Sequence, residues 1–399
     1  MATLALKSSF VQGQLLRRSA LLVAFLLSGG NSIFPRVPLA ALLIVICVIA
    51  LGGKSLARRE FTGCFLVLLA TFVVAMLGAD GIVSASMLIR FTNFILGLMV
   101  LSLYVELGRK AFTDDIYPLL KFMCYQSIAT TALGTIVPGL FTPFYVNETT
   151  YNTIGLILTF NPGADGGNPI VRSSGFFFEP GVFQFYLNMF LLLAAFVRGD
   201  PKHMALGLIA VLCTQSTTGL AISAILMVAY FVQRLKDAPS YGNLLITILS
   251  PILLIPFAML LSSNVEDKFF GTNRGSSWAR QYDTFTGFAV AVENPLVGIG
   301  FDYQRYFEES YHLGYKESEL DTNTLTDRPN SNGIVTAFYS LGFPLGLIFL
   351  FGLYRQLLID RRLLAFALMF LSFSTEALLF TPFALMFVFS GLLVRPQQR

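Results

Sequence analysis

The sequence predicts an all-α, polytopic integral membrane protein, and three observations lead to that prediction. Hydrophobic residues make up 55% of the 399 positions, and Phe alone accounts for 39 of them. Charged residues make up only 13%, about half of their usual share in soluble domains. Long apolar runs recur along the chain with short polar breaks between them. A soluble globule could not hide this much apolar surface, so lipid is the expected solvent for most of the chain.

The apolar runs predict about twelve membrane helices within one transmembrane domain over residues 1–399, because each crossing needs ~20 residues. Arg17 and Arg18 precede "SALLVAFLL" as in a signal peptide, but no clear A-x-A site follows, so an uncleaved first span is expected. The predicted helices lie at about 18–34, 38–53, 61–78, 82–107, 116–138, 180–197, 204–216, 218–233, 243–261, 333–353, 362–375 and 377–394. Three of them (204–216, 218–233 and 362–375) are short for a full crossing and are expected to be tilted, extended or broken.

The distribution of basic residues predicts that both termini are cytoplasmic. Basic residues gather in alternate short turns and in the C-terminal tail, at Lys54, Arg58, Arg59, Arg109, Lys110, Arg198, Lys202, Arg234, Lys236, Arg355, Arg361, Arg362, Arg395 and Arg399. The short turns of the opposite side hold only Arg36. Two long connections, at about 139–179 and 262–332, are expected to face outward as loops.

Several classes of site have no support in the sequence. The four cysteines lie in apolar runs without C-x-x-C spacing, and the two histidines, His203 and His312, are far apart. Neither a disulfide framework nor a metal site is therefore expected. Nucleotide-binding motifs are also missing, so we expect no cofactor and no nucleic-acid partner, and the energy must come from the substrate or a gradient.

Arginines in the outward loops are the first candidates for a binding site. Arg172, Arg274 and Arg328 each stand beside Gly, Pro or aromatic residues near a helix end, where a guanidinium suits a phosphate or pyrophosphate. A solvated surface is the alternative for Arg280, Lys268 and Lys316, since long loops tolerate basic residues.

Two charged groups lie close to or inside the predicted membrane region. Glu179 in "RSSGFFFEPGVF" precedes Pro180, so it either caps the next helix or pairs with Arg172, or it serves as a carboxylate base. Arg90 in "SMLIRFTNF" is an intramembrane arginine, which indicates a functional site unless it pairs with Asp80 or Glu376.

Four segments in order resemble the O-antigen polymerase and ligase superfamily. They are "RSSGFFFEPGVF" (172–183), "TQSTTGLAISAIL" (214–226), "NRGSSWARQYDTFTGFAVAVENPLVGIGFDYQRYF" (273–307) and "RPNSNGIVTAFYSLGFPLG" (328–346). The resemblance spans about 171–346. It implies a GT-C-like membrane glycosyltransferase of the bacterial inner membrane, whose two long loops are periplasmic and whose donor is an undecaprenyl-pyrophosphate-linked oligosaccharide.

The resemblance also implies roles for particular residues. Arg172 and Arg274 match family arginines that hold the pyrophosphate, and Glu179 matches the glutamate of the E-P motif. Further substrate contacts are expected from Arg90, Arg280, Arg305, Arg328, Asn330, Asn332, Trp278 and Tyr303. Membrane lipids and a chain-length regulator are the other expected partners.

One departure favours a polymerase over a ligase. Ligases place a histidine before a glycine with ten residues between them, and counting back from Gly342 gives Ser331, while His312 lies earlier in the loop. A serine has no useful basicity near neutral pH, so the ligase-type base is missing. The alternatives are a ligase that transfers glycan to the lipid A core, a glycan flippase, and a scaffolding membrane protein; a flippase would be expected to carry a pseudo-repeat in both halves.

Overall fold

The computed structural model describes residues 2–30, 33–52, 59–146, 149–162, 170–237, 262, 274–313 and 330–394. Its main helices are α1 (Ala2–Leu27), α2 (Arg36–Leu51), α3 (Thr62–Gly78), α4 (Ala85–Val105), α5 (Gly108–Ile136), α6 (Pro180–Leu193), α7 (Pro201–Thr214), α8 (Thr217–Asp237), α10 (Arg274–Glu293), α11 (Tyr303–His312), α12 (Gly333–Tyr354), α13 (Arg362–Phe373) and α14 (Pro382–Leu392). Three strands, β1 (Thr142–Val146), β2 (Thr149–Ile154) and β3 (Leu158–Phe160), form an antiparallel sheet in the order β1-β2-β3. The described chain is mostly helical, which is compatible with the predicted all-α class, and the small sheet lies within the first predicted loop.

Among the described residues, nine helical segments are apolar, and five of these are long enough to cross a membrane. The long ones are Arg59–Gly78, Ala85–Val105, Pro180–Arg198, Thr217–Lys236 and Gly333–Tyr354, while α2, α7, α13 and α14 are shorter. This composition supports a membrane protein. The predicted helix at 243–261 and the tail arginines Arg395 and Arg399 lie outside the described residues, so the count of about twelve spans stays a prediction.

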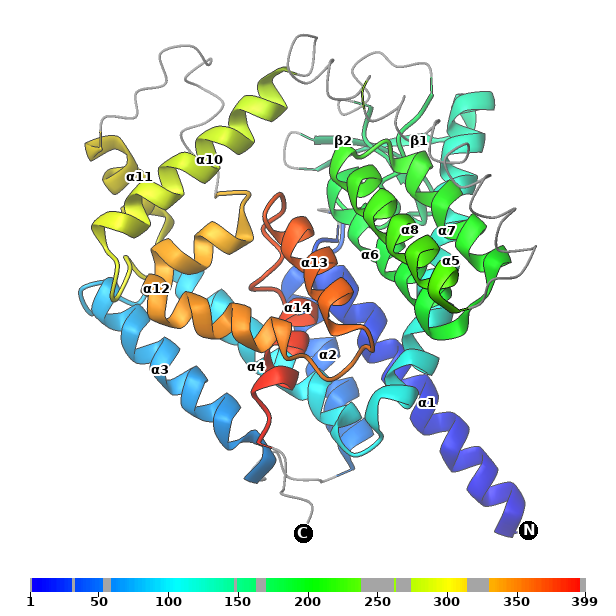
Figure 1. Cartoon of the computed structure of the whole chain (residues 1–399), viewed down its shortest axis with the longest axis horizontal. Coiled ribbons are helices and arrows are strands. Elements are labelled where there is room, and N and C mark those ends of the chain that lie inside the picture. The colour runs from blue at the N-terminus through cyan, green and yellow to red at the C-terminus, as the bar shows by residue number, and fades with distance from the viewer. Residues whose placement is uncertain are drawn as a thin grey trace.

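The two long connections contain more structure than the sequence predicts. The sheet and the segment that leads into α6 occupy the described part of 139–179, and the second connection contains α10 and α11. In Figure 1 the sheet, α10 and α11 lie at the upper end of the molecule, whereas α1 begins and α14 ends toward the lower edge. The described parts of the predicted loops therefore share one end of the helical body, and the start of α1 and the end of α14 share the other.

Helix α6 is the most completely buried helix of the body. Every residue from Pro180 to Leu193 is buried, and α6 contacts α5, α7, α8 and α13. Pro180 is a suitable first residue because its missing N–H would be unpaired in the first turn of any helix. The site described below lies at this first turn.

Helix α12 is broken at Gly342, and the segment 294–300 pairs with the broken backbone. Gly342 has φ 72° and ψ 167°, a conformation essentially restricted to glycine. Ile299 N and Gly300 N donate to Tyr339 O (2.8 Å) and Ser340 O (3.0 Å), and Phe343 N donates to Pro295 O (2.8 Å). A helix interrupted inside an apolar body needs such partners because lipid offers none. This pairing fixes α10, which precedes the segment, against α12.

Candidate functional site

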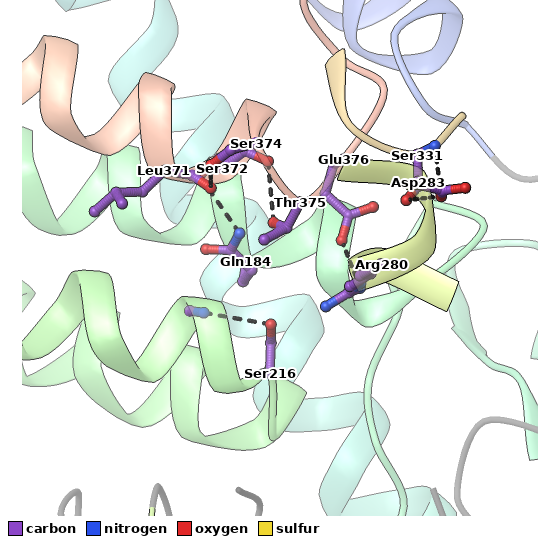
Figure 2. Close-up of polar contacts among 11 residues, drawn as sticks. Gln184, Ser216, Arg280, Asp283, Ser331, Leu371, Ser372, Ser374, Thr375 and Glu376 are labelled. Atoms are coloured by element: carbon purple, nitrogen blue, oxygen red, sulfur yellow. Dashed lines mark hydrogen bonds and ion pairs between the residues drawn. The ribbon is translucent and has the colours of Figure 1, made fainter. Parts of the chain in front are cut away.

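Three chain segments converge at the first turn of α6. The turn 374–381 between α13 and α14 supplies Glu376, α10 supplies Arg280 and Asp283, and the residues before α12 supply Ser331 (Figure 2). Gly333, the first residue of α12, packs directly on the turn 374–381, since an added Cβ would lie 3.0 Å from Glu376 O. The polar groups of these segments therefore lie together beside an otherwise apolar helix bundle.

The ion pair between Arg280 and Glu376 is the most buried charge pair of this region. Arg280 Nη2 donates to Glu376 Oε1 at 3.0 Å, and the side chains are 28% and 3% exposed, respectively. The carboxylate lies against Gly181, where an added Cβ would approach Oε1 to 2.2 Å. The second residue of α6 is glycine because the carboxylate needs this space. The positive end of the α6 dipole also favours an anion there.

The guanidinium of Arg280 is only partly used by Glu376. In the described part of the chain Arg280 makes this single side-chain contact, through Nη2, so Nε and Nη1 have no protein acceptor there. Its partial exposure leaves these donors accessible. Arg280 was predicted either to bind substrate or to be a solvated surface residue, and the ion pair with a buried glutamate excludes the second interpretation.

A second carboxylate, Asp283, lies one helical turn after Arg280. Asp283 is 4% exposed, and its Oδ2 accepts hydrogen bonds from Ser331 Oγ at 2.5 Å and from Ser331 N at 3.0 Å. Residues three apart on a helix share a face, so Arg280 and Asp283 project from the same side of α10. Ser331, the position where ligases would have histidine, is thus bonded to a buried acid.

Asn330 and Asn332 hold Ser331 from both sides. Asn332 caps α12, since its Oδ1 accepts from Ile334 N and Val335 N, and its Nδ2 donates to Thr284 Oγ1. Asn330 Nδ2 donates to Asp283 O at 2.6 Å and to the hydroxyl of Tyr306 at 3.0 Å. These buried amides join α10, α11 and α12, so their observed contacts are structural, and their predicted contact with substrate stays untested.

Burial also affects Tyr306, which lies on the short polar helix α11 outside the apolar spans. Burial raises the pKa of the Tyr306 phenol well above its usual value, and the neighbouring tyrosine Tyr339 adds to the effect. The hydroxyl therefore stays protonated at neutral pH. It holds Asn330 in place rather than exchanging protons.

Glu179 and Arg172, the predicted pair, are not paired with each other. Glu179 is the N-cap residue of α6, but its side chain makes no capping bond. Among the described residues it makes no ion pair either, so both structural alternatives predicted for it are wrong. Arg172 Nε instead donates to Thr214 O at 3.3 Å, at the last residue of α7, where the helix dipole favours a cation.

Arg90 and Arg305 have partners that the sequence did not indicate. Arg90 Nη2 donates to the hydroxyl of Tyr303 at 2.8 Å, and its guanidinium carbon lies 5.7 Å from the centre of the Phe380 ring. Asp80 pairs instead with Arg305 at 2.7 Å. The predicted pairing of Arg90 with Asp80 or Glu376 is therefore wrong.

The Asp80–Arg305 pair borders a separate cavity of about 630 Å³ along α11, which His312 also lines. His312 makes no hydrogen bond to Ser331 in the described part of the chain. The remaining predicted residues are less defined. Trp278 lies on α10 with 38% of its surface exposed. Arg274 begins α10, but its side chain is outside the described part, and Arg328 lies outside the described residues altogether.

Below the charged groups, a chain of buried amides and hydroxyls continues into the bundle. Gln184 Nε2 donates to Ser372 Oγ at 3.4 Å, and Asn188 Nδ2 donates to Gln184 Oε1 at 2.9 Å (Figure 2 shows the first of these contacts). Ser223 Oγ donates to Asn188 Oδ1 at 2.8 Å. Hydrogen bonds of this kind join helices in an apolar solvent, here α6 with α8 and α13.

The sequence analysis missed Asp283 and Gln184 as members of the region. The signal for Gln184 was available, because an amide inside a predicted span is unusual. Among the described residues, no group of three or more His, Cys, Asp or Glu side chains could hold a metal ion. In the comparisons with known proteins, no family model matches the chain, and no curated protein or solved structure is significantly similar to it.

Proposed function

We propose that this chain is a membrane glycosyltransferase of the O-antigen polymerase type. It transfers a growing glycan from undecaprenyl pyrophosphate onto the next lipid-linked repeat unit. In this proposal the chain has about twelve spans in a GT-C-like arrangement and lies in the bacterial inner membrane with both termini in the cytoplasm. It acts at the periplasmic face, with a chain-length regulator as its partner.

The observation that carries the proposal is the half-used guanidinium of Arg280. Its remaining donors are accessible beside the first turn of α6, where the helix dipole favours anions. The bundle around it is apolar and suits a polyprenyl chain. A ligand that joins a diphosphate to a long apolar tail matches this combination of a cation with a lipid-facing body.

The transfer is a displacement at the anomeric carbon. The acceptor hydroxyl attacks this carbon while its bond to the diphosphate oxygen breaks, which inverts the configuration. Negative charge grows on the leaving diphosphate, so Arg280, with Arg172 and Arg274, stabilises the transition state more than the ground state. Glu179, whose carboxylate has no partner among the described residues, orients the acceptor sugar. Trp278 and Tyr303 offer aromatic faces for sugar rings.

A transporter is the second candidate, and the broken helix α12 favours it, because discontinuous helices line many transport sites. In transporters the freed backbone groups coordinate the substrate or ion. Here the carbonyls of Tyr339 and Ser340 are already taken by the segment 294–300. The break therefore serves packing, and the glycosyltransferase remains the better supported function.

The test is the surface glycan of a deletion strain complemented with wild type, Arg280→Gln or Arg109→Gln. Arg109 pairs with Asp360 between the α4–α5 and α12–α13 turns, so it is a matched arginine away from the site. A polymerase predicts a ladder with wild type and Arg109→Gln, and single-repeat glycan with Arg280→Gln at equal expression. If the deletion strain without complementation makes bare lipid A core and accumulates lipid-linked polymer, the chain is a ligase. Loss of all periplasmic lipid-linked glycan would identify a flippase, and an unchanged deletion strain would exclude all three functions.

A further inference from the structure

We propose that Asp283 and Ser331 form a proton relay that removes the proton of the acceptor hydroxyl. This inference rests on the proposed function, because it names the groups that activate the acceptor in that reaction. The hydroxyl of Ser331 contacts the acceptor, and the carboxylate of Asp283 receives the proton through it.

The direction of the hydrogen bond between the two side chains supports the relay. A serine hydroxyl has one hydrogen, and Ser331 places it on Asp283 Oδ2 at 2.5 Å. Its lone pairs are then available to accept a hydrogen bond from another hydroxyl. Asp283 is 4% exposed, whereas Ser331 is only partly buried. The serine thus connects a buried carboxylate with the accessible side of the site.

The relay is held in a fixed geometry. The backbone N–H of Ser331 donates to the same Oδ2 at 3.0 Å. The backbone and the side chain of Ser331 are therefore both held against the carboxylate of Asp283. Asn330 and Asn332 fix the residues on either side through α10 and the first turn of α12. A base that is held in position before substrate binds loses little entropy when the proton moves.

The other carboxylate of the converging segments is already committed. Glu376 is engaged by Arg280, and protonating it would release the arginine that the diphosphate needs. Asp283 lies on the same face of α10 as Arg280, one turn away. The residue that binds the leaving diphosphate and the residue that accepts the proton therefore occupy neighbouring positions of one rigid helix.

The proton transfer balances as follows. The acceptor O–H bond breaks as its proton moves to Ser331 Oγ, and the original Ser331 hydrogen moves to Asp283 Oδ2. The acceptor oxygen forms a bond to the anomeric carbon, and the electron pair of the old glycosidic bond leaves with the diphosphate. Asp283 then returns its proton to water through Ser331.

The test uses the full chain in lipid nanodiscs with a polyprenyl-diphosphate-linked oligosaccharide as donor and acceptor. Asp283→Asn keeps an oxygen that accepts both hydrogen bonds but removes the basicity. We expect it to lower kcat by about 100-fold or more, with the KM of the acceptor and the Kd of the donor within about threefold of wild type. Ser331→Ala is expected to lower kcat similarly, and Ser331→Thr to restore most of it.

A structural role predicts a different pattern. If Asp283 only anchors α12, Asp283→Asn retains kcat, and Ser331→Ala and Ser331→Thr behave alike; either result overturns the relay. If Asp283→Asn does not fold, the comparison of Ser331→Ala with Ser331→Thr decides alone. A wild-type chain that binds donor but transfers no glycan refutes the proposed function itself, which separates that failure from failure of the relay.

Discussion

Replacing Gly342 with Ala tests whether the broken helix α12 positions the site. Two terms oppose an Ala at this position. The backbone conformation at φ 72° and ψ 167° costs a residue with a Cβ about 1–3 kcal/mol. The new Cβ would also lie 2.4 Å from the carbonyl carbon and oxygen of Leu296. The segment 294–300 must then retreat by about 1 Å to reach ordinary contact.

A retreat of this size breaks the hydrogen bonds between the segment and α12. The bonds from Ile299 N to Tyr339 O (2.8 Å) and from Gly300 N to Ser340 O (3.0 Å) exceed hydrogen-bond length after such a shift. Each backbone group left without a partner costs about 1–3 kcal/mol. We therefore expect Gly342→Ala to destabilise this pairing by at least about 3 kcal/mol.

Gly52→Ala is the matched control. Gly52 has φ 57° and ψ 38°, so an Ala there is also strained, at about 1 kcal/mol, but nothing lies within 4 Å of its Cβ position. This strain acts on the end of α2 and leaves the pairing of segment 294–300 with α12 unchanged, so the full difference of about 3 kcal/mol is expected there, which is about 100-fold or more in the opening equilibrium.

Hydrogen exchange of the Ile299 and Gly300 amides in nanodiscs measures this opening. We expect about 100-fold or faster exchange of these amides in Gly342→Ala than in Gly52→Ala, accompanied by loss of transfer activity. Equal exchange in the two variants would mean that the segment does not depend on the break, and the argument that α12 positions α10 would be wrong.

Three further predictions follow from individual contacts. Gly181→Ala is expected to displace the Glu376 carboxylate, whose Oε1 would lie 2.2 Å from the new Cβ, and to lower transfer as Arg280→Gln does, whereas weakened expression without loss of specific activity would contradict this. Asp115→Asn is expected to lower the free energy of unfolding by about 2 kcal/mol, because Asp115 is fully buried between Arg17 (2.7 Å) and Arg18 (3.4 Å). Asp114→Asn is the control, because the pair between Asp114 and Arg198 is exposed. In the same thermal unfolding experiment the control should cost less than about 1 kcal/mol. The pKa of Asp200 is lowered below 3.8, mainly by the hydrogen bond from His203 N, so its capping of α7 is present above about pH 4 and is lost as the pH falls through the folded-state pKa. The protection of the Lys202 and His203 amides, measured against their intrinsic exchange rates, should fall with pH in wild type and stay constant in Asp200→Ala.

Helix boundaries could be predicted where an apolar run ends at a polar or glycine residue. The predicted 61–78 and 333–353 agree with α3 and α12 to within a residue. Helix α1 begins far earlier than the predicted 18 because its first half mixes apolar and polar residues, and a search for long apolar runs does not detect such a segment. Helix α10 was predicted as loop for the same reason.

The sheet had a signal that the sequence analysis did not use. Its strands "TPFYV" and "TTYNTI" are rich in Thr, Tyr, Val and Ile, which favour strands. The assumption that an outward connection in a membrane protein is irregular overrode this local preference.

The contacts of the site could not be predicted in the same way. Arg280 and Glu376 are 96 residues apart, and Asp283 and Ser331 are 48 apart, so no periodicity of a helix or strand relates them. Their proximity depends on the break at Gly342 and on the close approach at Gly181, and a single glycine in an apolar run does not reveal either.

The arginines of the outward end differ in the partner that fixes each guanidinium, and this difference changes their expected importance. Arg172 Nε donates to the carbonyl of Thr214 at the end of α7. Arg90 donates to the hydroxyl of Tyr303, and Arg305 pairs with Asp80. Arg280 keeps two donor nitrogens beside a helix N-terminus while a buried glutamate fixes its position. An anion that reaches this end gains most from Arg280, because the guanidinium is already oriented and little entropy is lost on binding. Arg280, for which a solvated surface was the alternative interpretation, is therefore the residue among these four whose loss should weaken donor binding most.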